Sequence, residues 1–264
     1  MKKMIQAAAL AVSLFAATST MADTTLQNIS KSGELRVCFD AGYMPFEMKA
    51  KNGEFIGFDI DLGQMLAKAI DVKFTPVNTS WDGIIPALLT NKCDVIMGGM
   101  TITAKRNMQV NFTQPYVVIG QSILLNSKLA GTVTSYRDLN DAKYTIATKL
   151  GTTGIVAAER FLPNAKQNKF ETTADAALEV SNGKADAFVY DLPFNAIYAA
   201  QNKGQVVHLD QPFTFEPLGF AVRQGDADFL NFLNNYLNQI KGDGTYDRIY
   251  NKWFKSASWL SKVQ

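Results

Sequence analysis

Short apolar runs alternate with amphipathic stretches along the chain from about residue 35 onward. The run at 35–39 is typical of a buried strand, whereas apolar residues between 58 and 69 recur at the spacing of one helix face. The same pattern predicts further strands at 74–77, 95–97, 122–125, 144–147, 169–171, 187–190 and 219–222. It predicts further helices at 84–89 with Asp82 as the cap, and at 151–161, 173–182, 191–201, 228–241 and 245–254.

This alternation of strands and helices predicts an α/β protein whose sheets are mostly parallel and covered by helices on both faces. Two lobes of about 100 residues each suit the length better than one sheet of ten strands. Ligands of such folds bind beyond the carboxyl ends of the strands. The candidate functional residues are therefore those in the loops that follow the strands.

The first 22 residues have the pattern of a secretory signal peptide. Lys2 and Lys3 precede an apolar run at 4–17, and small and polar residues follow up to Ala22. A membrane anchor is the alternative, but the run is shorter than the roughly 20 apolar residues that span a bilayer, and no Cys follows it for lipid attachment. We expect cleavage after Ala22 and an exported, periplasmic protein at 23–264.

Composition and charge narrow the possible partners. The chain has 26 Lys and Arg against 24 Asp and Glu, and removal of Lys2 and Lys3 leaves 24 of each sign. A nucleic-acid-binding protein would carry a basic stripe, and none is visible. One His and two Cys exclude a histidine-rich metal site and a disulfide framework. We expect no cofactor and no nucleic-acid partner.

The loop after the first predicted strand places aromatic residues at a strand end. It reads Asp40-Ala41-Gly42-Tyr43-Met44-Pro45-Phe46, and Trp81 stands in a comparable strand-to-helix connection. Each aromatic could simply be core. Together they suggest a sandwich for a flat or aliphatic group of a ligand.

Two glycines follow the strand at 95–97. Gly98 and Gly99 would let a ligand approach the backbone closely, Thr101 adds a hydroxyl, and Arg106 adds a planar fork suited to a carboxylate. A lone Arg is more often a solvated surface charge. The combination favours an anion cradle.

The second half of the chain offers two further candidates. Lys149-Leu150-Gly151-Thr152-Thr153-Gly154 joins a strand to a helix, so its amides and hydroxyls could hold an anion. Asp191 follows the strand at 187–190. It could be an ordinary helix N-cap, or it could accept hydrogen bonds from a ligand ammonium.

With these residues in place, the chain resembles the polar amino-acid-binding proteins of bacterial ABC importers, solute-binding family 3. The resemblance covers about residues 35–254 and rests on six segments in family order. These are Gly57-Phe58-Asp59-Ile60-Asp61-Leu62, Trp81-Asp82-Gly83-Ile84-Ile85-Pro86-Ala87-Leu88, Thr101 to Arg106, Gly151-Thr152-Thr153, Ala185-Asp186-Ala187 with Asp191, and Gly244-Thr245-Tyr246 with Trp253-Phe254.

The resemblance implies a type II periplasmic-binding-protein fold and a role for each candidate. Arg106, Thr101, the Gly99 amide and the pair Thr152-Thr153 would hold the ligand α-carboxylate. Asp191, the Gly98 carbonyl and the Thr101 hydroxyl would hold the α-ammonium. Tyr43 and Trp81 would sandwich the side chain, and Asp40 and Lys149 would contact its far end.

These roles imply a receptor that binds a free L-amino acid and delivers it to an ABC permease in the inner membrane, and we expect it to act as a monomer. Glutamine is the first choice of ligand, because an amide can accept from Lys149 and donate to Asp40. Tyr190 stands where glutamine binders can carry His. Arginine, lysine and histidine are the alternative ligands. An enzyme resembling cyclohexadienyl dehydratase and a soluble sensory receptor are the alternative functions.

The sequence also suggests where the chain crosses between the lobes and whether the two cysteines are bonded. We expect hinge segments at 116–120 and 214–218, the first lobe at 23–115 and 219–264, and the second at 121–213.

If the strands that carry or precede them are parallel neighbours, Cys38 and Cys93 would be offset by about three residues, or ~10 Å. A disulfide needs Cα atoms within about 7 Å, so we expect free thiols.

Overall fold

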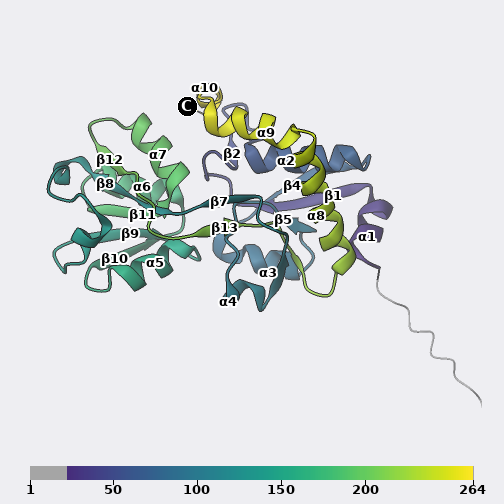
Figure 1. The fold of residues 1–264 in the computed structure, drawn as a ribbon, viewed down its shortest axis with the longest axis horizontal. Helices are drawn as coiled ribbons and strands as arrows, with labels where there is room; N and C mark the ends of the chain where they lie inside the picture. The colour runs from purple at the N-terminus through teal and green to yellow at the C-terminus, as the bar shows by residue number, and fades with distance from the viewer. Residues whose placement is uncertain (1–22, 264) are drawn as a thin grey trace, which may run out of the picture.

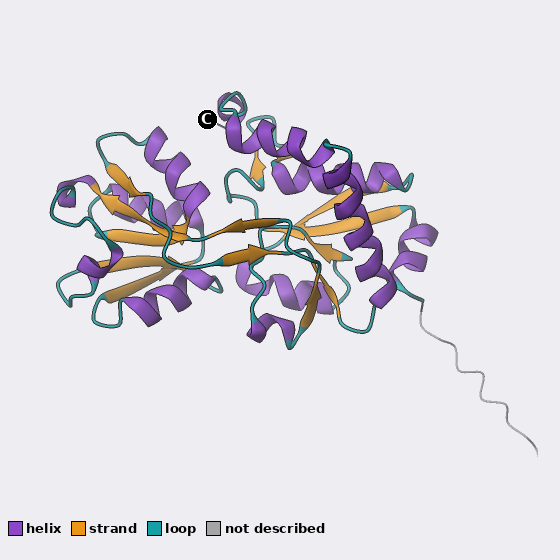
Figure 2. Cartoon of the chain, viewed as in Figure 1, coloured by secondary structure: helices purple, strands orange, loops and turns teal. Residues whose placement is uncertain are grey.

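The computed structural model describes residues 23–263, which form two α/β lobes joined by a pair of strands (Figure 1). Each lobe has a five-stranded mixed sheet between helices (Figure 2). The predicted two-lobed fold class is confirmed. The predicted signal peptide at 1–22 lies outside the described residues. Within residues 23–263, no helix is both long enough and apolar enough to cross a membrane.

The first lobe is built on the sheet β4-β1-β5-β14-β6. Strand β1 is parallel to β4 and β5, whereas β14 is antiparallel to both of its neighbours. The strands are β1 (Glu34–Phe39), β4 (Lys73–Asn78), β5 (Val95–Ile96), β6 (Val110–Phe112) and β14 (Ala221–Arg223), with a small hairpin of β2 (Met48–Lys49) and β3 (Phe55–Ile56) beside them. The helices are α1 (Thr25–Ser32), α2 (Phe58–Ala69), α3 (Ile84–Leu89), α4 (Ala104–Asn107), α8 (Ala227–Gly242), α9 (Thr245–Tyr250) and α10 (Leu260–Val263).

The second lobe repeats this plan with the sheet β10-β9-β11-β8-β12. Here β9 is parallel to β10 and β11, and β8 is the reversed strand. The strands are β8 (Gln121–Asn126), β9 (Thr145–Lys149), β10 (Lys166–Phe170), β11 (Ala187–Asp191) and β12 (Val206–Leu209). The helices are α5 (Thr153–Phe161), α6 (Thr173–Ser181) and α7 (Leu192–Gln201).

Successive residues of the central strands serve opposite faces of each sheet, as the strand period of two requires. In β1, Val37 packs in the core shared with α2 and α8, while Cys38 packs with α3. In β11, Phe188 belongs to the core beside α6, and Val189 to the core beside α5. Helices therefore cover both faces of both sheets, and the strand ends are left to form the site.

Two short antiparallel strands, β7 (Val117–Ile119) and β13 (Glu216–Leu218), lie side by side between the sheets (Figure 1). β7 runs on into β8, and β13 runs on into β14. Each crossing strand thus leads directly into the reversed strand of the next sheet. This arrangement accounts for the one antiparallel strand in each otherwise parallel sheet.

The expected capping role of Asp82 is wrong. Trp81–Gly83 form a 3₁₀ turn, and α3 begins at Ile84 with Gly83 at its N-cap position and no capping side chain. The N–H of Ile84 donates to the carbonyl of Trp81. Asp82 therefore lies inside a turn that already satisfies this amide, one residue too early to cap the helix.

The expectation of free thiols is also wrong, because Cys38 and Cys93 form a disulfide with Cα atoms 5.7 Å apart. The estimate of ~10 Å assumed that the residues before β5, including Cys93, continue it as a straight strand. In the structure β5 starts only at Val95, and Cys93 belongs to the turn that follows α3. That turn brings Cys93 against the α3 face of β1, where Cys38 points.

Candidate functional site

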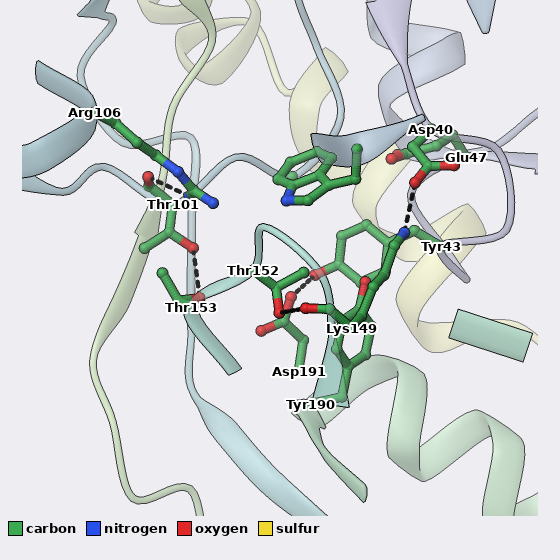
Figure 3. A pocket seen from close by; sticks show the side chains of 12 residues that line it. Asp40, Tyr43, Glu47, Thr101, Arg106, Lys149, Thr152, Thr153, Tyr190 and Asp191 are labelled. Atoms are coloured by element: carbon green, nitrogen blue, oxygen red, sulfur yellow. Dashed lines mark hydrogen bonds and ion pairs between the residues drawn. The ribbon is translucent and has the colours of Figure 1, made fainter. Parts of the chain in front are cut away.

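One buried cavity lies where the strand ends of the two lobes meet (Figure 3). Its lining combines three acidic residues, two basic residues, three aromatic residues, three threonines and a glycine. They are Asp40, Glu47, Asp191, Arg106, Lys149, Tyr43, Trp81, Tyr190, Thr101, Thr152, Thr153 and Gly99. Ten of the eleven residues that the sequence singled out are therefore brought together, and Gly98 is not among them.

Arg106 reaches the cavity from α4, whose first turn is capped by the Thr103 hydroxyl. Its guanidinium donates to the carbonyl of Thr101 at 2.9 Å and, across the cleft, to that of Gly151 at 3.1 Å. It also lies over the Trp81 ring, 5.6 Å from the centroid. Burial lowers the pKa of Arg106, and the negative charges of Glu216 and Asp191 partly offset this decrease. Arg106 is thus a cation held in place by neutral carbonyls, with charge to offer an anion.

Asp191 ends β11 and occupies the N-cap position of α7, but its side chain caps no amide. Its carboxylate instead accepts from the Tyr43 hydroxyl of the other lobe and from the Gln121 amide, both at 2.5 Å. Burial raises the pKa of Asp191 to about 7, against the opposing effect of these hydrogen bonds and of Arg106. A carboxylate so desolvated gains from a cation, and because it caps no amide it is available to the cavity.

The threonines differ in what they offer. The Thr101 and Thr153 hydroxyls face one another across the cleft at 3.4 Å. The Thr152 hydroxyl donates to the carbonyl of Lys149 in its own loop, at 2.7 Å. Thr101 and Thr153 are therefore the threonine hydroxyls that bridge the two lobes, while Thr152 stiffens the loop before α5.

The expected role of the Gly99 amide needs correction. The Gly99 N–H donates to the Asp59 carboxylate at 2.8 Å and approaches the Tyr116 hydroxyl, so it is not turned toward a ligand. Gly98 is not among the lining residues, and an added Cβ there would be 3.2 Å from Glu47 and 3.3 Å from Phe39, so its carbonyl contact with a ligand stays a prediction. Both glycines allow close packing of the wall: a Cβ on Gly99 would overlap the Tyr43 ring.

Asp40 and Lys149 form an ion pair across the cleft at 2.6 Å, at the side of the cavity away from Arg106 (Figure 3). The Lys149 ammonium also lies 5.9 Å from the Trp81 ring centroid. Tyr43 stacks on the buried Phe46 with 4.5 Å between centroids, and Tyr190 packs edge-on against Tyr43. The two ends of the cavity thus differ: one carries a guanidinium, the other an ion pair.

Sequence reasoning missed Glu47 and Gln121. Glu47 is fully buried in the cavity wall beside Asp40. It follows the aromatic loop directly, and a carboxylate between Phe46 and Met48 was the available signal. Gln121 donates to both Asp191 and Thr153 and so orients them. Nothing in its sequence context marks it, because its role depends on the pairing of β8 with β11.

Comparisons with known proteins identify the family of this chain. The model of "bacterial extracellular solute-binding proteins, family 3" matches residues 35–256. The putative ABC transporter arginine-binding protein 2 of Escherichia coli is 33% identical, over 97% of this chain and 100% of its own.

Two solved structures are each 52% identical to this chain. The ancestral amino acid-binding protein AncCDT-1, a precursor of cyclohexadienyl dehydratase, has a TM-score of 0.83 over 88% of this chain and 100% of its own. A putative ABC transporter binding component from Wolinella succinogenes, complexed with lysine, has a TM-score of 0.84 over 87% and 99%.

Proposed function

Because the chain belongs to the bacterial extracellular solute-binding proteins of family 3, we propose that it binds one free L-amino acid between its lobes and delivers it to an ABC permease. The observation that carries this is the placement of Arg106 and Asp191. They come from different lobes and line one cavity. A guanidinium and a carboxylate there complement the α-carboxylate and α-ammonium of a zwitterion, so that one ligand holds both lobes.

The far end of the cavity supports a cationic side chain on the ligand. Lys149 is already neutralised by Asp40, and Glu47 adds a second carboxyl at the same end. A lysine or arginine side chain would bring the missing positive charge to this acidic surplus. The lysine complex of the Wolinella succinogenes relative and the arginine-binding name of the Escherichia coli relative support the same class.

Glutamine stays as the second candidate ligand, because Lys149 can donate to an amide carbonyl and Asp40 can accept from the amide nitrogen. Titration calorimetry with each of the twenty amino acids tests both. We expect one-to-one binding, tightest for lysine or arginine and weaker for glutamine. Tightest binding of an apolar amino acid would contradict the assignment, as would no binding of any.

We also propose that the lobes move about residues 116–120 and 214–218, with 23–115 and 219–264 in one body and 121–213 in the other. The pairing of β7 with β13 at these positions supports this. Export after cleavage at Ala22, and action as a monomer, complete the proposal. The N-terminal residue of the mature protein and its mass in solution test these two points.

A dehydratase on the same fold is the second candidate function. The observation in its favour is that burial raises the pKa of Asp191 to about 7, so a cavity carboxyl can carry a proton at neutral pH. Against it, Asp191 accepts two hydrogen bonds and faces the place of the ammonium. Incubation with a cyclohexadienyl acid, followed by absorbance for an aromatic product, tests it. We expect no product.

A further inference from the structure

Glu47 is a charged residue of the cavity wall whose carboxyl has neither an ion-pair nor a hydrogen-bond partner in the described structure. Its side chain is fully buried, and neither carboxylate oxygen has a hydrogen-bond partner among residues 23–263. Its backbone is fixed, because the Glu47 N–H and carbonyl both bond to Tyr43. The carboxyl faces the same end of the cavity as Asp40 and Lys149 (Figure 3).

The groups that face Glu47 are mostly acidic. Asp59 on α2, Asp40 after β1 and Asp191 at the end of β11 act on it by charge, and Lys149 on β9 is the cation that opposes them. Lys149 is held by Asp40 at 2.6 Å. The neutral phenols of Tyr43, Tyr116 and Tyr190 complete the surroundings.

Asp59 does not offset this excess of acidic groups around Glu47. One of its oxygens accepts from the Gly99 N–H and from the Tyr116 hydroxyl, and the other has no partner among the described residues. A buried carboxylate without a cation or donors takes up a proton, because desolvation penalises the charged form. Burial first, and then the charges of Asp59 and Asp40, raise the pKa of Glu47 well above its usual value.

We propose that Glu47 selects the charge of the ligand side chain by exchanging a proton. Glu47 holds its proton while the site is empty or contains a neutral side chain, and it loses the proton to solvent when a cationic side chain enters. The net charge of the cavity then stays the same, because the positive charge of the ligand side chain replaces that of the released proton. The inference rests on the proposed binding of an amino acid and adds the proton as a competing ligand of the same site.

One consequence separates Glu47 from Asp191, the other cavity carboxyl that carries a proton near neutral pH. Every amino acid presents an ammonium to Asp191, so any proton that Asp191 releases is common to all ligands. The side-chain effect therefore lies in the difference between a cationic ligand and its neutral isostere. Arginine and citrulline form such a pair, and lysine with norleucine is a second.

Calorimetry in two buffers of different ionisation enthalpy counts the protons released on binding. At a pH where free Glu47 is protonated, arginine should release one proton more than citrulline. The ratio of arginine to citrulline affinity should then fall about tenfold for each unit by which pH is lowered in that range. Equal proton counts, or a ratio independent of pH between about 5 and 8, would overturn the inference.

Glu47→Gln is the decisive variant, and Glu54→Gln, at an exposed Glu outside the cavity, is its matched control. In Glu47→Gln the difference in proton count between the paired ligands should vanish, whereas Glu54→Gln should keep it. A difference that persists in Glu47→Gln would assign the proton to another group and refute the inference.

If Glu47→Gln binds too weakly to titrate, infrared difference spectra of the wild type decide. Arginine, but not citrulline, should remove a protonated-carboxyl band that is absent from Glu47→Gln. Persistence of that band with arginine bound would overturn the inference. Failure of both ligand pairs to bind would instead contradict the proposed function.

Discussion

At the scale of single residues, the side chains proposed to hold the ligand also join the two lobes. Arg106 and Trp81 of the first lobe both donate to the Gly151 carbonyl of the second, each at 3.1 Å. The Tyr43 hydroxyl likewise crosses the cleft to Asp191. A ligand that engages Arg106 and Asp191 therefore binds where the lobes already hold one another. Substitutions at these positions should alter both affinity and closure.

Arg106 gives the sharpest test of the ligand contacts. Arg106→Ala should weaken binding by about 2–5 kcal/mol, or roughly 30- to several-thousand-fold, because a buried α-carboxylate would lose its charged partner. Arg106→Lys should fail almost as badly, since an ammonium lacks the planar fork. Titration at matched melting temperature measures this, with the exposed neighbour Lys105→Ala as control. Near-native affinity of Arg106→Ala would refute the role.

Two substitutions of Trp81 separate the effect of ring packing from that of the hydrogen bond across the cleft. Trp81→Phe keeps an aromatic ring beside Arg106 and Lys149 but removes the N–H that donates to Gly151. We expect a loss of about 1 kcal/mol, or roughly fivefold in affinity, as for one neutral hydrogen bond. Trp81→Leu should lose more, because the ring is also gone. Wild-type affinity in Trp81→Phe would show that the N–H contributes nothing, and equal affinities for the two variants would show that the ring contributes nothing.

At the scale of elements, periodicity located most of the strands and helices that carry the site. β1, α2, β9, β11 and α8 lie within a few residues of their predicted positions. Short strands such as β6, β7 and β13 were missed, because three residues give no period and their pairing is long-range. The missed Glu47 and the wrong cysteine prediction have a related cause. Both depend on where irregular turns carry the chain, which alternation does not encode.

The disulfide links β1 to the turn before β5 and closes a separation of 55 residues. Its reduction should lower the free energy of unfolding by about 4 kcal/mol in the chain-entropy account. Denaturant titration with and without reductant measures this. The variant Cys38→Ala with Cys93→Ala is the control and should not respond to reductant. Alkylation of two thiols in the unfolded, unreduced protein would contradict the bond.

At the scale of the whole molecule, the buried carboxyls couple stability to pH. Asp191 has a pKa of about 7 in the folded protein, against about 3.9 when unfolded. Between these values the folded state binds the extra proton, so the free energy of unfolding falls as pH rises, by up to about 1.4 kcal/mol per unit for this group. Below the lower value its contribution is constant.

Denaturant titrations of the ligand-free protein from about pH 4 to 8 should show this decline. Asp191→Asn should make the slope shallower, and the exposed Asp247→Asn should leave it as it is. Asp59 and Glu47, whose pKa values burial also raises, should keep part of the slope in Asp191→Asn. A stability that rises with pH over this range would contradict the described surroundings of these carboxyls.

Closure of the two lobes is the remaining whole-molecule prediction. The structure has contacts across the cleft at both ends of the cavity, from Arg106 to Gly151 and from Asp40 to Lys149. A ligand that adds an ammonium and a carboxylate between them should shift the population toward this closed form, by about tenfold for each 1.4 kcal/mol of preference. X-ray scattering should therefore give a smaller radius of gyration with saturating lysine or arginine. Arg106→Ala at the same ligand concentration should keep the ligand-free curve. Superimposable wild-type curves with and without ligand would show that binding does not close the lobes.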